Sequence, residues 1–199
     1  MWNLLERAPK QFDQTFLQWL REMENYLSIA FADWYSSRAE IEEVQEYIQA
    51  LGPKVPDELL FYYQNVYPFG QARDGAHRWA VQMKRYKEIW GQYSEEMLIA
   101  APPIWPIDCF HKYDVVGFVS SGGDLAIIRL DPRSGRGSPI AAGLRNYFLV
   151  EVAVQILAEG SIGDVDFDRL RSDPKVISLS GWPANNPPKQ VALNMKTSS

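Results

Sequence analysis

The chain has 199 residues, of which 46% are hydrophobic and 13% aromatic, so it can bury a sizeable core in one domain and is not disordered throughout. A net charge of −5 and a pI near 5.1 argue against general nucleic-acid binding, which needs clustered Lys and Arg. A single Cys excludes an internal disulfide, and with only two His the usual zinc spacings are missing. We therefore expect no metal and no cofactor.

The N-terminal residues bring charges within seven positions, and no apolar stretch typical of a secretory signal follows them. The longest apolar run, 97–107, is interrupted by Pro102, Pro103 and Pro106 and is too short to cross a bilayer. We expect a cytoplasmic protein that has no membrane association.

The first half of the chain predicts helices. Apolar residues recur with a helical period after Lys10, and Ser37 stands three residues before Glu40 in a capping-box arrangement. Pro56 and Asp57 are typical of the first turn of another short helix. The four predicted helices span 10–30, 37–51, 56–66 and 75–90, and the proline-rich segment 101–106 is expected to be extended or turned.

The second half predicts strands at 113–119 and 125–130, joined by a turn that contains Gly122, Gly123 and Asp124, and a third strand near 138–142. The segment 145–159 is ambiguous, because its alternating valines favour a strand whereas its apolar residues four positions apart favour a helix. We predict a helix that stops at Gly160. One more strand is predicted at 175–179, followed by a loosely held tail.

Two stretches carry a family resemblance. The sequence Leu-Gly-Pro-Lys-Val-Pro-Asp-Glu-Leu-Leu at 51–60 leads into an aromatic helix that ends in Asn65, and a Gly-Asp strand pair later ends at Asp131. This order resembles the SMI1/KNR4 family of the SUKH superfamily over 37–160. The chain departs from the family pattern at Val55, where Leu is usual, and at Val66, where Gly usually follows the Asn.

The resemblance implies an α+β domain, with a mainly antiparallel sheet of about four to six strands and helices packed against it. We accordingly divide the chain into an N-terminal helical extension (1–36), an SMI1/KNR4-like domain (37–180) and a loosely ordered tail (181–199). Members of this family include immunity proteins that neutralise bacterial toxins and non-enzymatic regulatory or scaffold modules.

Charge is unevenly distributed along the predicted helices. Segment 37–60 holds six acidic residues against two basic ones, a balance of −4, while 73–87 holds five basic residues against one acidic residue. Such faces are usually simply solvated, but an acidic face can also steer a charged protein partner. The candidate partner-binding residues are Glu42, Glu43, Glu46, Asp57, Glu58, the aromatic Trp105 and the turn residue Asp124.

No catalytic signature is present. Ser120 and Ser121 lack the Gly-x-Ser-x-Gly order, and Cys109 with His111 lacks a third partner. We predict a non-enzymatic protein-binding domain, specifically an immunity protein that occludes a toxin, with a basic toxin as the candidate partner. The alternatives are a regulatory or scaffold module and, less favoured, a small-molecule enzyme that uses residues such as Asp108.

Overall fold

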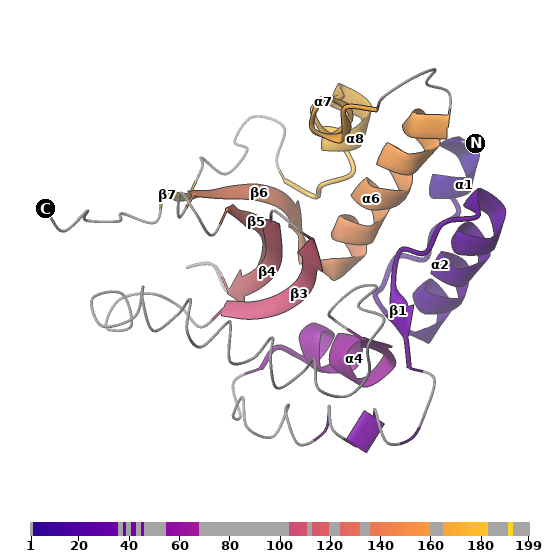
Figure 1. The fold of residues 1–199 in the computed structure, drawn as a ribbon. Coiled ribbons are helices and arrows are strands. Elements are labelled where there is room, and N and C mark those ends of the chain that lie inside the picture. The colour runs from indigo at the N-terminus through magenta and orange to yellow at the C-terminus, as the bar shows by residue number, and fades with distance from the viewer. Residues whose placement is uncertain are drawn as a thin grey trace, which may run out of the picture.

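The computed structural model describes residues 2–35, 38, 41–42, 45, 55–67, 104–110, 113–119, 124–131, 136–159, 165–182 and 191–192. Figure 1 shows the arrangement of these parts. The helices are α1 (Trp2–Leu5), α2 (Gln14–Leu27), α4 (Asp57–Asn65), α6 (Gly143–Glu159), α7 (Phe167–Arg171) and α8 (Pro174–Ile177). The strands are β1 (Asp33–Trp34), β2 (Val66–Tyr67), β3 (Ile104–Phe110), β4 (Tyr113–Val119), β5 (Leu125–Asp131), β6 (Arg136–Ala142) and β7 (Val191–Ala192).

The α+β class is observed, but the prediction of one sheet with four to six strands is wrong. The described residues form seven strands in two separate antiparallel sheets: a two-stranded sheet β1-β2 and a five-stranded sheet in the order β3-β4-β5-β6-β7. The small sheet arises because α4 ends at Asn65 and Val66 takes up an extended conformation, in which it pairs with Trp34. We had expected Val66 to belong to the helix.

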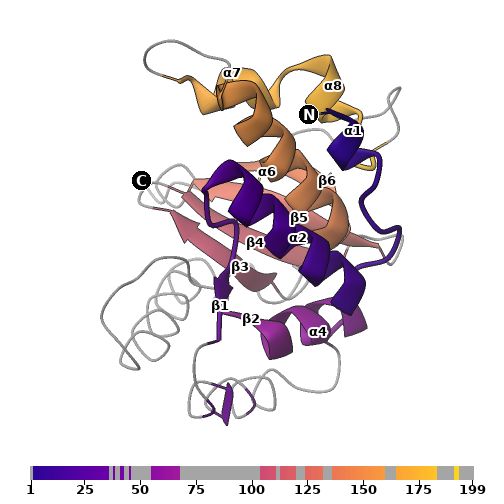
Figure 2. The ribbon, with the colours of Figure 1, turned by 90° about the vertical axis from the view of Figure 1, so that its right-hand side faces the viewer.

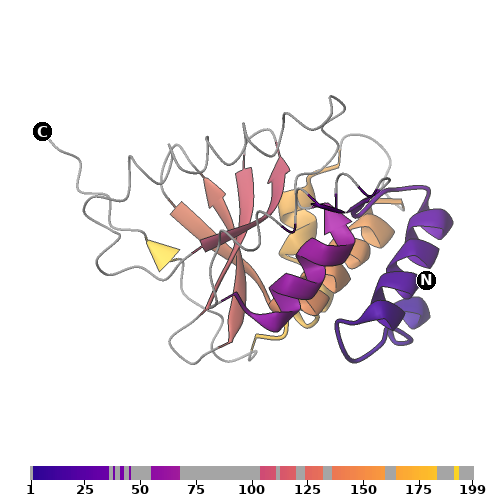
Figure 3. The same cartoon turned by 90° about the horizontal axis from the view of Figure 1, so that it is seen from below.

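The central element is α6, which lies between the large sheet and the N-terminal helices (Figures 1 and 2). Its apolar residues surround the helix axis, and every residue before Glu159 is at least partly buried. A helix that is apolar on all sides is typical of a fully covered core position. Seen from below, α4 and α6 separate the sheet from α2 (Figure 3).

Aromatic rings join the N-terminal segment to this core. The ring of Phe12 stacks on that of Phe148 of α6, with centroids 5.9 Å apart and planes within 2° of parallel. Phe16 is fully buried and contacts both Trp19 and Phe148. The residues that we expected to form a helical extension therefore share one core with α6.

Several predicted elements are observed where we expected them. The first predicted helix corresponds to α2, whose start is set by Asp13, because its side chain accepts hydrogen bonds from the backbone N–H groups of Thr15 and Phe16. The strands predicted at 113–119, 125–130 and near 138–142 are β4, β5 and β6. The helix predicted for 145–159 is α6. Most of the predicted helix 37–51 and all of 75–90 lie outside the described residues.

One local prediction fails, and the proline-rich segment, which we expected to be extended or turned, is extended where the structure describes it. The strand expected at 175–179 is instead helix α8, because Asp173 caps it and Pro174 occupies its first turn, where a missing N–H costs nothing. The proline-rich segment contributes strand β3, in which Pro106 lies beside an irregularity at the edge of the sheet. Edge strands and bulges are the places where a sheet tolerates proline.

The C-terminal tail supplies strand β7, which pairs Val191 and Ala192 with Gly137 and Arg136 of β6. Further along β6, the N–H of Ala142 donates to the carbonyl of Ser180 at 2.7 Å. Residues 191–192 thus form the edge strand of the large sheet next to β6. Among the described helices, none is long and apolar enough to cross a membrane.

Candidate interaction surface

The described acidic candidates differ in what they contact. Glu42 is exposed and pairs with Arg38 one helical turn earlier, with Oε1 3.1 Å from Nε. Asp57, the first residue of α4, is also exposed, and so is Asp124 directly before β5. Glu43 and Glu46 lie outside the described residues. The remaining acidic candidate, Glu58, points into the molecule.

Glu58 joins α4 to the first turn of α6. Its Oε1 atom accepts hydrogen bonds from the backbone N–H groups of Leu144 at 2.8 Å and Arg145 at 3.3 Å. The first N–H groups of a helix have no partner within the helix, so the carboxylate satisfies two of them. Burial raises the pKa of Glu58, and the hydrogen bonds from Arg145 and Leu144 oppose that rise. Glu58 therefore serves the fold, which corrects its assignment to a partner surface.

Gly143 makes this close approach possible. Its φ is +80°, and a Cβ built there would lie 3.3 Å from both carboxylate oxygens of Glu58. The side chain of Arg145 extends from the same turn and donates through Nε to the carbonyl of Pro9. Three segments that are far apart in sequence therefore meet at the N-terminus of α6.

Trp105 is buried, with 3% of its surface exposed, so it cannot anchor a partner on the surface. It lies in β3 opposite Gly117 of β4, where a Cβ would approach the side chains of Leu125, Ile107 and Ile127. Trp182, the other tryptophan in a proline-rich segment, is half-buried. Within the described part of the chain, its indole N–H is buried and has no hydrogen-bond partner.

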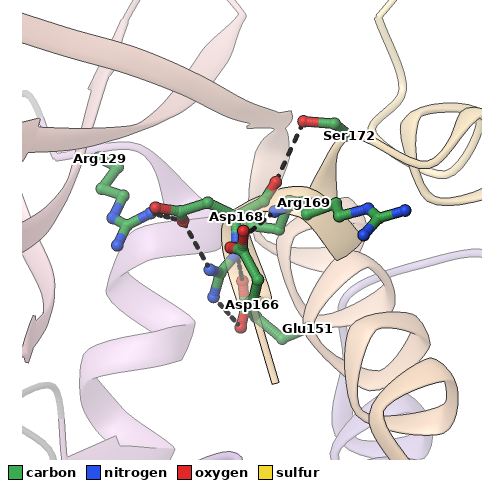
Figure 4. A network of polar contacts seen from close by, with 7 residues as sticks. Arg129, Glu151, Asp166, Asp168, Arg169 and Ser172 are labelled. Carbon is green, nitrogen blue, oxygen red and sulfur yellow. Dashed lines mark hydrogen bonds and ion pairs between the residues drawn. The ribbon is translucent and has the colours of Figure 1, made fainter. Parts of the chain in front are cut away.

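A network of charges that sequence reasoning missed connects the sheet, α7 and α6 (Figure 4). Arg171 donates from Nε and Nη2 to the two carboxylate oxygens of Glu151, at 3.1 and 2.9 Å. Asp168 pairs with Arg129 of β5, and its Oδ1 also lies 3.5 Å from Nη1 of Arg171. Burial lowers the pKa of Arg171, but the charge and hydrogen bonds of Glu151 outweigh it and raise the pKa overall.

The network holds α7 in place, while the outer side of α7 and α8 remains accessible. Asp166 caps α7 through the N–H groups of Asp168 and Arg169. Phe167 is 39% exposed and Ile177 is 46% exposed, and both are among the large hydrophobic residues that remain exposed. The signal that sequence reasoning overlooked is the pair Asp166 and Asp173, each of which is a helix-capping residue.

No group of three or more His, Cys, Asp or Glu side chains in the described part of the chain is placed to hold a metal. Asp108 and Cys109 belong to β3, whereas His111 lies outside the described residues. No family model, curated protein or solved structure matches this chain. Function must therefore be argued from the charged and exposed residues themselves.

Proposed function

We propose that this protein is a non-enzymatic protein-binding domain of SMI1/KNR4 type, and that it acts as an immunity protein that occludes a toxin through an acidic surface. The observation that carries the proposal is the exposure of Asp57 and Glu42 within a segment whose charge balance is −4. The side chain of Asp57 makes no hydrogen bond or ion pair with the residues that the structure describes. Its charge is therefore available to a partner.

Electrostatics supports a basic partner. Clustered charges of one sign raise the rate at which an oppositely charged protein arrives, and they suppress encounters with partners of like charge. The chain as a whole is acidic, with a net charge of −5. A basic toxin whose active site must be covered is a partner of the appropriate charge.

The proposal is tested by purifying the tagged protein from its native host, identifying what co-elutes by mass spectrometry, and repeating the elution at high salt. We expect one basic, toxin-like protein whose binding weakens with salt, because exposed charges are screened. Co-expression of this protein should then protect cells from that toxin. Recovery of housekeeping complexes alone would instead favour the regulatory or scaffold alternative.

A matched pair of variants tests the surface. The double variant Asp57→Asn, Glu42→Gln should weaken binding about two- to thirtyfold, since exposed ion pairs each contribute roughly 0.2–1 kcal/mol. The control Glu6→Gln neutralises an exposed carboxylate outside this segment and should leave binding unchanged. Equal effects of the two variants would show that only net charge matters, and would contradict a local acidic contact.

A further inference from the structure

The outer side of α2 carries an arginine that is fixed over a tryptophan ring. The guanidinium carbon of Arg21 lies 4.1 Å from the centroid of the Trp34 ring, in the geometry of a cation–π contact. Trp34 is half-buried in β1, whereas Arg21 is exposed. Figure 2 shows β1 alongside α2 on the face of the molecule turned to the viewer.

The ring under Arg21 is itself held in place. The carboxylate of Glu24 accepts a hydrogen bond from the indole N–H of Trp34 at 2.8 Å through Oε2. Its Oε1 atom accepts hydrogen bonds from the backbone N–H groups of Phe31 and Ala32, both at 2.9 Å. Glu24 therefore fixes the segment that leads into β1, and its two oxygens are already engaged.

Arg21 consequently keeps its own donors unused. Among the residues that the structure describes, the guanidinium of Arg21 contacts the Trp34 ring and forms no ion pair or hydrogen bond. A guanidinium offers five N–H donors in a planar fork that matches a carboxylate. The contact with the Trp34 ring restrains the position of the guanidinium before any ligand arrives, which lowers the entropic cost of binding.

The neighbours of Arg21 on α2 are suited to the same ligand. Gln18 and Asn25, three residues before and four residues after Arg21, are exposed on the same side of the helix. Both side chains are neutral amides that can donate to an oxygen. Glu22 is also exposed, but adjacent residues on a helix point about 100° apart, so it does not lie on this side.

We propose that Gln18, Arg21 and Asn25, with Trp34 beneath the arginine, form a docking surface for a carboxylate-bearing segment of a partner protein. Arg and Trp are enriched among residues that dominate binding energy at interfaces, and here they are already in contact. The favoured occupant is an acidic peptide, because the surface presents a cation beside two neutral amides, and the carboxylate of Glu24 next to Trp34 is already engaged by three N–H donors. This surface is separate from the acidic segment invoked above and does not depend on the function proposed there.

The test is a heteronuclear NMR titration of the full chain with hexaglutamate, following the Nε–H signals of Arg21 and Trp34. We expect both signals to shift, with a dissociation constant of about 1 mM for a single carboxylate contact. Arg21→Gln should weaken this binding about tenfold. Arg169→Gln is the matched control and should leave binding unchanged, because Arg169 is also exposed but contacts no aromatic ring among the residues that the structure describes.

Two further variants separate geometry from charge. Arg21→Lys keeps the charge but loses the planar fork, so we expect binding about threefold weaker than in the wild type. Trp34→Leu leaves Arg21 in place but removes its support, and should also weaken binding. The proposal is overturned if wild type and Arg21→Gln respond equally to hexaglutamate. It is also overturned if inorganic phosphate shifts these signals more strongly, since the surface would then select phosphate.

Discussion

The carboxylate of Glu58 accepts a hydrogen bond from the backbone N–H of Leu144, which lies 86 residues further along the chain. This contact ties α4 to the first turn of the central helix. It depends on a carboxylate that is half-buried and on a glycine that leaves space for it.

Replacing Glu58 by alanine should lower the free energy of unfolding by about 1 kcal/mol, because two N–H groups of α6 lose their acceptor. Glu58→Gln retains an amide oxygen and should stay within about 0.5 kcal/mol of the wild type. Urea unfolding measures both values. Asp57→Asn, one residue earlier on the exposed side of α4, is the control. If it lowers the free energy of unfolding as much as Glu58→Ala does, the loss reflects a general sensitivity of α4 to removed charge and not the contact with α6.

The same residue predicts a pH dependence. Burial raises the pKa of Glu58 above its ordinary value of 4.5, so the folded protein binds this proton more tightly than the unfolded chain does. The resulting stabilisation is fully present below pH 4.5 and is lost as the pH rises through the raised pKa. The difference in unfolding free energy between wild type and Glu58→Gln should therefore fall with rising pH in that window. A difference that stays constant with pH would show that the carboxyl is not perturbed.

Gly143→Ala should destabilise the protein by about 1–2 kcal/mol, since a residue with a Cβ is strained at a φ of +80°. A second contribution comes from the approach of the new Cβ to the Glu58 oxygens. Measuring Gly143→Ala in a Glu58→Ala background separates the two effects. Backbone strain alone would give the same loss in both backgrounds, whereas crowding against the carboxylate would give a smaller loss in the second.

The ion pair between Arg171 and Glu151 should contribute measurably to stability. The two side chains are 24% and 13% exposed, so removing either one leaves a poorly solvated charge. We expect Glu151→Gln to lower the free energy of unfolding by about 2 kcal/mol. A double-mutant cycle with Arg171→Met should give a favourable interaction energy between the two side chains. The exposed pair Arg38 and Glu42 provides the comparison and should couple by less than about 0.5 kcal/mol. Equal coupling in the two cycles would contradict the importance of burial.

Sequence patterns predicted those elements whose signals are local. The glycine-containing turn before Leu125 placed β4 and β5, and apolar spacing placed α2. The small sheet was missed because strands of two residues, such as Val66–Tyr67, carry no periodicity. The strand β3 was missed because Pro106 suggests an irregular chain, although a sheet edge accepts it.

The roles of the candidate residues were harder to predict than the elements. Nothing in the local sequence distinguishes Asp57, which is exposed, from Glu58, which caps α6, because the difference depends on where α6 packs. The same holds for Trp105, which stands in a proline-rich stretch of sequence and yet is buried in β3. Charge counts identify an acidic segment, but only packing decides which of its members face solvent.

The enclosure of α6 also limits how this protein can diverge in sequence. Because every α6 residue before Glu159 is covered at least in part, most substitutions there must preserve size and polarity together. The outer sides of α2, α7 and α8 carry no such requirement. New binding specificities should therefore arise by changes on those peripheral helices, while the central helix stays nearly constant among descendants of the same ancestor.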